Sequence, residues 1–411
     1  MIIKQFWQGI GLTTLLLTLF TPLHAEPVTP KAVIQTYANI AYANYSDSLS
    51  TAKILQDKIK ALIAKPSEQT QQDAKQAWLS ARQPYGQTEV FRFGNPNVDQ
   101  WEGQVNAWPL DEGLIDYVND DLYDHEEGNR YANANIIASK EPLTAELLKS
   151  YQEKGGSEAN VATGYHAIEF LLWGQDLNEK PNTAGQRPYT DYVSGSGCTH
   201  SNCERRAQYL QIVTDLLVSD LQTMVEAWSE NKKDNYRAAL LAVDEKEALR
   251  RMLFGMGSLS LGELAGQRMN VALLANSQED EHSCFSDNTH SDIAANAQGI
   301  QNIYTGTYKR VDGSTVSGAS LAQLLANQDN KLSQLLLEKL SITQQKAAAI
   351  VAAADKGEAF DQQITPENKA GNERVQATIE ALRSQTAEFE TMARILGIEA
   401  VSTDRFNSLG G

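Results

Sequence analysis

The segment ATGYHAIEFLLWG, residues 162–174, is apolar at nearly every position. The exceptions are Thr163, His166 and Glu169. An apolar run of this kind predicts a buried helix, and Gly174 is a typical stop just past the end of a helix. We therefore expect a helix that other parts of the chain enclose.

His166 and Glu169 are three residues apart, so a helix places them on one face. An imidazole and a carboxylate in apolar surroundings need partners, because burying either group unpaired is costly. The two side chains could satisfy each other, contact other polar groups or bind a cation. Gly164 has no side chain, so another backbone segment or a ligand can approach the helix closely there.

The composition is that of a globular protein. The chain has 411 residues, 42% of them hydrophobic and 21% charged, which is enough for two domains of ordinary size. Its formal net charge of -17 argues against a nucleic-acid partner, because phosphate binding needs a basic surface. An acidic surface suits cations or cationic partners, and it is equally common as an aid to solubility.

The N-terminus has the pattern of a secretory signal peptide. Lys4 provides the positive charge, residues 10–20 form a short apolar stretch, and cleavage is expected after Ala25. That stretch is too short to span a membrane, and no later stretch is apolar enough to do so. We expect an exported, periplasmic protein without a transmembrane segment, and association with the envelope remains an option.

Export permits a disulfide, and two of the three cysteines lie in one loop rich in Gly, Ser and Asn. A bridge between Cys198 and Cys203 is the favoured interpretation. The alternative is a metal site that includes His200, but two thiolates and one histidine lack a fourth ligand. Cys284 is then expected to be a buried thiol.

Helical periodicity recurs along most of the chain. Thr29 and Pro30 are typical of a helix start, the pattern that follows ends near Pro66, and Ser67 caps the next helix. No alternating strand pattern extends over more than a few residues, so the predicted fold class is all-α. Further helical patterns cover residues 204–228, 244–275, 320–354 and 367–396.

Long helices with short connections pack as bundles, so we expect two helical-bundle domains with a shared interface and pseudo-symmetric halves. The predicted divisions are a signal peptide over residues 1–25, an N-terminal bundle over 26–190 that carries the Gly-x-His-x-x-Glu motif, and a C-terminal bundle over 191–411. Residues 95–131 form a polar segment without periodicity, which is usual for a functional or surface-wrapping loop.

A metal site at His166 and Glu169 needs more ligands, because two side chains do not fill a coordination shell. A mixed set of imidazole and carboxylate ligands would suit iron or zinc. The alternative is a structural pair whose members hydrogen-bond in the core. The acidic candidates from other segments are Glu89, Asp111, Glu112 and Asp116.

The same helix does not match a known hydrolytic metal motif. Zinc peptidases place two histidines at helical spacing together with a glutamate base, and here no second histidine stands at the required offset. The inverted peptidase pattern would need histidine where Phe170 stands. Di-iron bundles carry Glu-x-x-His, which is the reverse order. The residues therefore give no direct support for peptide hydrolysis.

Two further segments contain candidate ligand-binding residues. A helix with Gly262 and Gly266 implies close packing or access, because glycine inside a helix costs stability. The polar run over residues 281–290 is either a solvated loop that caps the next helix or part of a site. The candidates in these segments are Glu263, Arg268, His282, Ser286 and Asp287.

Five segments together resemble the imelysin-like family, and they span most of the chain in the expected order. They are Trp78–Phe93, Trp108–Leu110, the Gly164/His166/Glu169 helix, Gly262–Arg268 and His282–Asp287. The family includes iron-regulated periplasmic proteins and proteins named as peptidases. The resemblance implies two helical bundles with the His/Glu motif near their interface, a role around iron acquisition and, in some members, a proposed peptidase activity.

The leading hypothesis is an imelysin-like periplasmic protein of iron acquisition that binds a metal ion, iron or zinc, or an iron-related ligand between its bundles. His166 and Glu169 would face the ligand, Glu89 would be the third group, and Asp111 or Asp116 could take part. The second hypothesis is a metal-dependent peptidase that uses the same site. The third is a non-catalytic partner of envelope iron-uptake machinery, in which the His/Glu pair is structural.

Overall fold

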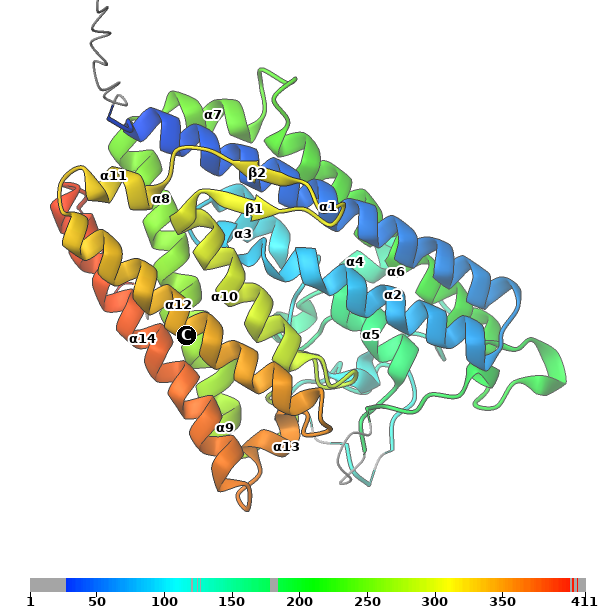
Figure 1. Ribbon diagram of the computed structural model, residues 1–411. Helices are drawn as coiled ribbons and strands as arrows, with labels where there is room; N and C mark the ends of the chain where they lie inside the picture. The colour runs from blue at the N-terminus through cyan, green and yellow to red at the C-terminus, as the bar shows by residue number, and fades with distance from the viewer. Residues whose placement is uncertain are drawn as a thin grey trace, which may run out of the picture.

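The computed structural model describes residues 27–119, 121–123, 125, 127–177, 184–399, 401–402 and 405, so the predicted signal peptide lies outside the described residues. In this part of the chain nearly all regular structure is helical (Figure 1), which confirms the predicted all-α class. The elements are α1 (Pro30–Ala64), α2 (Glu68–Gly86), α3 (Pro96–Glu102), α4 (Ala145–Tyr151), α5 (Gly164–Trp173), α6 (Cys203–Trp228), α7 (Tyr236–Ala242), α8 (Glu245–Ser258), a π-helical segment (Leu259–Val271), α9 (Ala272–Ala275), α10 (Thr289–Thr305), β1 (Thr307–Lys309), β2 (Thr315–Ser317), α11 (Leu321–Ala326), α12 (Asn330–Ala354), α13 (Phe360–Ile364) and α14 (Lys369–Ile395).

Helices α1, α2, α5 and α6 pack together as the N-terminal bundle. α1 begins where the Thr29 side chain accepts a hydrogen bond from the Ala32 N–H at 3.3 Å, with Pro30 in the first turn. α2 begins at a capping box formed by Ser67 and Thr70. Both starts confirm the caps that the sequence predicts. The apolar faces of these helices surround α5, whose ten residues are all buried.

The C-terminal bundle is built on one long helix that α8, the π-helical segment and α9 form without interruption. Helices α10 and α14 pack against it, and α12 packs against α10 and α14. The extent of this long helix agrees with the helical pattern over residues 244–275. The helical pattern in the sequence does not predict its π-helical winding.

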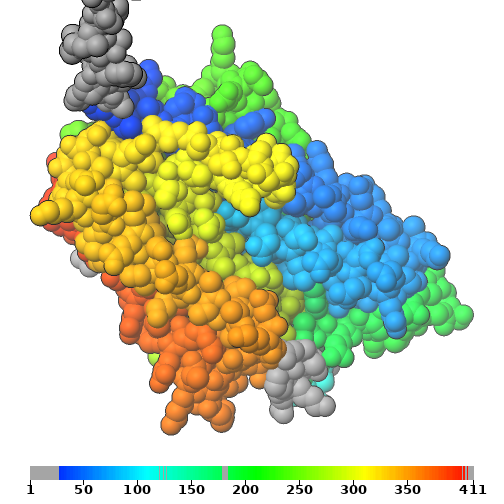
Figure 2. Space-filling model, viewed as in Figure 1, coloured from blue at the N-terminus to red at the C-terminus, as the bar shows by residue number. Residues whose placement is uncertain are grey.

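Helix α1 belongs to both bundles and lies along one edge of the molecule (Figure 1). Its first half, residues 33–45, shares a core with α8 and α10, and its second half, residues 49–62, shares a core with α2 and α5. In Figure 2 the early and late parts of the chain meet along a seam between α2 and the yellow and orange segments. The division between residues 190 and 191 stays a prediction; the structure packs α6, which follows it, against α1 and α5.

The only strands in the described residues form a short antiparallel hairpin that lies on α1. The hydroxyl of Tyr308 donates to Asp47 Oδ2 at 3.0 Å, and Arg310 pairs with Asp47 Oδ1 at 2.6 Å. These contacts attach the hairpin to the helix. Among the described helices, none combines the length and the apolar character needed to span a bilayer.

Candidate functional site

The N-terminus of α5 lies against the backbone of the polar segment that precedes it in sequence. Gly164 has a φ of 83°, and a Cβ at this position would lie 2.4 Å from the Val105 carbonyl oxygen. The next residue, Tyr165, donates its N–H to the same oxygen at 2.8 Å. A glycine is therefore required, and the close approach that the sequence predicts at Gly164 is made by another backbone segment.

His166 and Glu169 are fully enclosed, and they contact each other as their spacing predicts. His166 Nδ1 lies 2.8 Å from Glu169 Oε2. The other carboxyl oxygen, Oε1, accepts two hydrogen bonds from Ser286, one from the N–H at 3.0 Å and one from the hydroxyl at 2.7 Å. The C-terminal half of the chain thus completes the partners of this carboxyl group.

His282 brings a second imidazole to the same place. Its ring centroid lies 4.9 Å from that of His166, and the ring of Trp108 packs edge-on against it at 5.6 Å. The indole N–H of Trp108 donates to the Glu281 carbonyl oxygen at 2.5 Å, which fixes the loop beside the indole. We call the group His166, Glu169, His282 and Ser286 the polar centre.

Both imidazoles of the polar centre are neutral at ordinary pH. Burial is the main cause that lowers the pKa of each well below 6.5, and the charges of Arg82 and Arg268 add to it. Burial raises the pKa of Glu169 to about 8, although the hydrogen bonds from Ser286 oppose that rise. The interior therefore holds these groups in uncharged forms.

Each imidazole also has one nitrogen without a hydrogen-bond partner among the described residues. These atoms are His166 Nε2 and His282 Nδ1, and both are buried. The closest acidic oxygen to His282 Nδ1 is Asp292 Oδ2 at 3.6 Å, which is too far for a hydrogen bond. Buried polar atoms in native proteins are nearly always partnered, so these two nitrogens are the candidate ligand-binding atoms of the polar centre.

A buried ion pair, Arg82–Asp292, lies beside the polar centre. Arg82 Nε donates to Asp292 Oδ1 at 3.1 Å, and its guanidinium also donates to Asn106. The hydroxyl of Ser283 donates to Asp292 Oδ2 at 2.5 Å. The side chains of Arg82 and Asp292 are almost completely buried, so each charge depends on the other.

The π-helical segment provides a second cluster, formed by Glu263, Arg268 and Glu89. In a π-helix residue i bonds to residue i+5, so side chains five apart come onto one face. Arg268 Nε accordingly donates to Glu263 Oε1 at 3.0 Å, and Arg268 Nη2 donates to Glu89 Oε2 at 2.7 Å. Glu263 and Arg268 thus pair with each other within the segment, and Glu89 is the third member of the cluster.

A small cavity of about 160 Å³ lies beside both clusters. Asn106, Trp108, Arg268, Glu263 and Glu102 are among the residues that line it. Burial raises the pKa of Glu102 to about 7, although the charge of Arg92 opposes that rise. The cavity leads from the protein surface to side chains that contact His282.

The structure brings only some of the predicted ligand residues together. His166, Glu169, His282 and Ser286 meet at the polar centre, whereas Glu89, Glu263 and Arg268 form the neighbouring ion-paired cluster. Asp116 lies elsewhere, where it pairs with two arginines. Asp111 accepts a hydrogen bond from Asn129. Asp287, with a φ of 58°, lines a groove that Ser286 also lines, and no contact with His166, Glu169 or His282 is seen for it.

The described residues do not form a complete metal shell. They contain no group of three His, Cys, Asp or Glu side chains close enough to hold a metal ion. The two unpartnered imidazole nitrogens fit a transition metal as ligands, but structural zinc takes four ligands. Glu169 contacts His166 Nδ1, as carboxylates do when they orient a metal-bound histidine from behind. The remaining donors would have to come from the bound molecule or from water.

Asp292 and Asn106 are the residues of this region that sequence reasoning missed. Asp292 stands in the first turn of α10, where an acidic residue is typical of any helix start. Asn106 lies in the polar segment, two residues before the Trp108 landmark. Neither position carries a local signal that distinguishes it, because its partners come from distant parts of the chain.

Comparison with known proteins agrees with this architecture. The family model for imelysin matches residues 41–389. Iron-regulated protein A of Synechococcus elongatus is 23% identical over 356 residues, which cover 85% of this chain and 80% of that protein. A candidate iron-regulated protein A precursor of Parabacteroides distasonis has a TM-score of 0.66 at 19% identity, with 91% of this chain and 97% of that one covered. An imelysin-like protein of Psychrobacter arcticum has a TM-score of 0.55 at 16% identity, with 91% and 99% covered. The structural likeness shows a shared fold, and the match of the family model over most of the sequence shows that this chain belongs to the imelysin family.

Proposed function

We propose that this chain is an exported, periplasmic protein of iron acquisition whose polar centre binds an iron-related ligand between the two bundles. Membership of the imelysin family supports the iron-related role, as do relatives named iron-regulated protein A. The signal-peptide pattern of residues 1–25 supports export.

The observation that carries the proposal is the pair of unpartnered, buried imidazole nitrogens on His166 and His282. A neutral imidazole is the commonest side-chain ligand for transition metals. The rings are 4.9 Å apart, and they come from opposite halves of the chain. A ligand that engages both would therefore also join the two bundles.

The ligand that fits best is a metal carried in a complex with its own donors. The chain supplies two nitrogens and no third close ligand among the described residues. The positive charges of Arg82 and Arg268 help to lower the pKa of both imidazoles. The same two charges would repel a bare cation. Donor atoms on the bound molecule would complete the coordination shell and offset that repulsion.

The test is metal binding by protein purified without chelators or affinity metal. Elemental analysis comes first, followed by titration with Fe²⁺ and Zn²⁺ under anaerobic conditions and with ferric citrate. We expect ferric citrate to bind more tightly than either bare ion.

His166→Ala and His282→Ala should each weaken binding by about tenfold or more. His125→Ala, which alters an exposed histidine, is the matched control. A wild-type protein that binds none of the three at micromolar concentration rejects the proposal.

The second candidate is a metal-dependent peptidase that uses the same centre. The structure gives it one favourable observation, since His282 supplies the second imidazole that the α5 motif lacks. Peptide cleavage by wild type but not by Glu169→Gln would support it. If both metal binding and cleavage are absent, the third hypothesis remains, a non-catalytic partner of envelope iron-uptake machinery.

A further inference from the structure

A second cavity, of about 400 Å³, lies at the C-terminal end of α5, whereas the polar centre lies near the start of that helix. We call it the Trp173 cavity. Its volume is in the usual range for small-molecule sites. The polar 95–131 segment, the end of α5, the residues just before the disulfide loop and His200 within that loop line it. Asp116, which the sequence predicts to be a metal ligand, belongs instead to a group of ion pairs behind the Trp173 cavity.

The walls of the Trp173 cavity include four planar groups, those of Tyr117, Trp173, Arg187 and His200. Tyr117 and His200 stack on each other, with ring centroids 4.5 Å apart and an angle of 29° between the rings. The guanidinium of Arg187 lies over the Tyr117 ring at 4.9 Å. Trp173 and Leu177 add an indole and an exposed aliphatic side chain to the lining. Flat aromatic walls of this kind fit a flat ligand.

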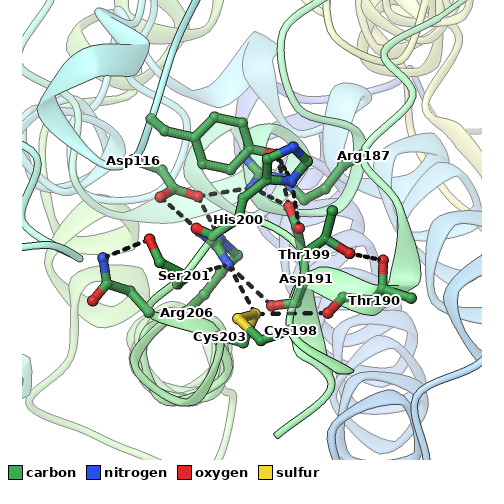
Figure 3. The surroundings of a disulfide bond; sticks show 12 residues. Asp116, Arg187, Thr190, Asp191, Cys198, Thr199, His200, Ser201, Cys203 and Arg206 are labelled. Atoms are coloured by element: carbon green, nitrogen blue, oxygen red, sulfur yellow. Dashed lines mark hydrogen bonds and ion pairs between the residues drawn. A yellow bond between two sulfur atoms is a disulfide. The ribbon is translucent and has the colours of Figure 1, made fainter. Parts of the chain in front are cut away.

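Two arginines behind the cavity share the carboxylate of Asp116, and one of them also pairs with Asp191 (Figure 3). Arg187 Nη1 lies 2.7 Å from Asp116 Oδ2 and 3.1 Å from Asp191 Oδ2. Arg206 Nε lies 2.6 Å from Asp116 Oδ2. The positive charges of the two arginines balance the negative charges of Asp116 and Asp191, and all four side chains are buried.

Lys75 adds a positive charge that no carboxylate offsets. Its ammonium lies 5.1 Å from the centroid of the Trp173 ring and makes no ion pair among the described residues. Burial and the charge of Arg187 lower the pKa of Lys75 to about 8, so the ammonium lacks the stabilisation that an anion would give. In a chain with a net charge of -17, this corner carries a local positive excess.

Arg187 has one donor left over. Its Nε is buried without a hydrogen-bond partner among the described residues, whereas its Nη1 donates to both Asp116 and Asp191. This atom faces Gly174, where an added Cβ would lie 3.7 Å from it, and Gly174 also lines the cavity. An unsatisfied cationic donor at the wall of a cavity points to an acceptor on a ligand.

We propose that the Trp173 cavity is a second binding site, which takes a small planar anion of the aromatic carboxylate class. The ring of the ligand would pack against Tyr117, His200 and Trp173, and its carboxylate would face the positive charges of Arg187 and Lys75. This site is separate from the polar centre, and it does not depend on the function proposed for that centre.

The disulfide explains how an exposed loop can supply one wall of the site. Cys198 and Cys203 are bonded, and His200 lies within the loop that this bond closes. His200 Nδ1 lies 2.7 Å from Asp191 Oδ1 and 3.1 Å from the Tyr117 hydroxyl (Figure 3). The cross-link reduces the conformational freedom of the loop, so the imidazole is positioned before a ligand arrives.

The experiment is calorimetric titration of the full-length mature protein with benzoate. Benzamide has the same shape without the charge, and cyclohexanecarboxylate has the charge without the flat ring, so the pair separates the two features. We expect saturable binding of benzoate, with both analogues at least about fivefold weaker. Benzamide or cyclohexanecarboxylate that binds as tightly as benzoate overturns the proposed ligand class, and no saturable binding of benzoate overturns the site.

Variants locate the binding. Lys75→Gln should weaken benzoate binding by about threefold to fivefold, because the ammonium is partly exposed to solvent. His200→Ala should weaken it by a similar factor, because it removes one wall. Lys331→Gln, an exposed lysine in the other bundle, is the matched control and should bind benzoate as wild type does. Unchanged affinity in both test variants, with native far-UV circular dichroism, places benzoate elsewhere and rejects the proposal.

Discussion

The imidazole of His282 lies 4.9 Å from that of His166, although the two residues belong to opposite halves of the chain. Ser286 adds to this contact between the two halves of the chain, because its N–H and its hydroxyl both donate to Glu169. The buried α5 helix is thus held from the N-terminal side by apolar packing and from the C-terminal side by polar contacts. Changes at this junction should therefore affect both the stability of the fold and the binding of a ligand.

Ser286→Ala should lower the free energy of unfolding by about 1–3 kcal/mol, because the buried carboxyl group of Glu169 loses a hydroxyl donor at 2.7 Å. The pKa of Glu169 should rise further, since the Ser286 hydrogen bond is a cause that lowers it. Urea denaturation measures the first effect, and carbon NMR of the labelled carboxyl group measures the second. Ser219→Ala on the exposed face of α6 is the control and should change neither quantity. An unchanged carboxyl pKa in Ser286→Ala contradicts the contact.

The pKa of Glu169 also predicts how stability depends on pH. The pKa of Glu169 is about 8 in the folded protein, so the carboxyl group holds its proton up to about pH 8, whereas an unfolded chain releases it near the usual pKa of 4.5. The folded state therefore binds more protons between these values, and the contribution of Glu169 to stability falls as pH rises through that window, by roughly 1.4 kcal/mol per unit at most. The two histidines act oppositely, because their lowered pKa values make stability rise with pH up to about 6.5.

Comparison of wild type with Glu169→Gln isolates that contribution. The variant keeps the shape of the side chain and cannot ionise, so its unfolding free energy should fall less steeply between pH 6.5 and pH 8. Chemical denaturation at several pH values measures both slopes. Parallel curves for the two proteins would show that Glu169 does not hold its proton in the fold.

Gly164→Ala should destabilise the protein strongly. The new Cβ would lie 2.4 Å from the Val105 carbonyl oxygen, and the φ of 83° is itself unfavourable for alanine. We expect a loss of at least about 1–3 kcal/mol in unfolding free energy. Gly156→Ala is the matched control, because Gly156 has a φ of 87° with open space around it. Equal losses in both variants would show that backbone strain alone, without the clash, explains the effect.

The Cys198–Cys203 bond predicts a simple labelling pattern. Under denaturing, non-reducing conditions, a thiol reagent should modify Cys284 alone, because the other two cysteines carry no thiol. Mass spectrometry of the labelled protein counts the modified residues. Modification of all three would refute the bond, and reduction before labelling is the positive control. The same spectrum shows whether cleavage follows Ala25, as the signal-peptide pattern predicts.

Local features were predictable from the sequence because their causes are local. The caps Thr29 and Ser67, the stop at Gly174 and the bridge between Cys198 and Cys203 all depend on residues within a few positions. The contact between His166 and Glu169 follows from helical spacing in the same way.

Long-range partners could not be predicted from patterns. Asp116 has the chemistry of a metal ligand, but its charge is taken up by Arg187 and Arg206, which lie far along the chain. Glu89 likewise pairs with Arg268. Which cation meets which carboxylate depends on tertiary packing, and no local rule contains that information.

The ion pair between Arg268 and Glu89 allows a last prediction, which concerns the π-helical segment. Arg268 is buried and pairs with both Glu89 and Glu263. Its removal leaves Glu89 without an ion-pair partner among the described residues and leaves Glu263 with Arg92 alone, at 3.6 Å. Arg268→Met should lower the unfolding free energy by about 3–5 kcal/mol, because an uncompensated buried charge costs more than a lost contact.

The double variant Arg268→Met with Glu89→Gln should recover part of that loss, since one of the two carboxylates is then neutral. Denaturation of wild type, both single variants and the double variant forms a cycle that measures the coupling between the two residues. A coupling energy near zero would mean that Glu89 does not depend on Arg268. Arg250→Met, which breaks a half-exposed pair with Glu247 on α8, is the control and should cost less than about 1 kcal/mol.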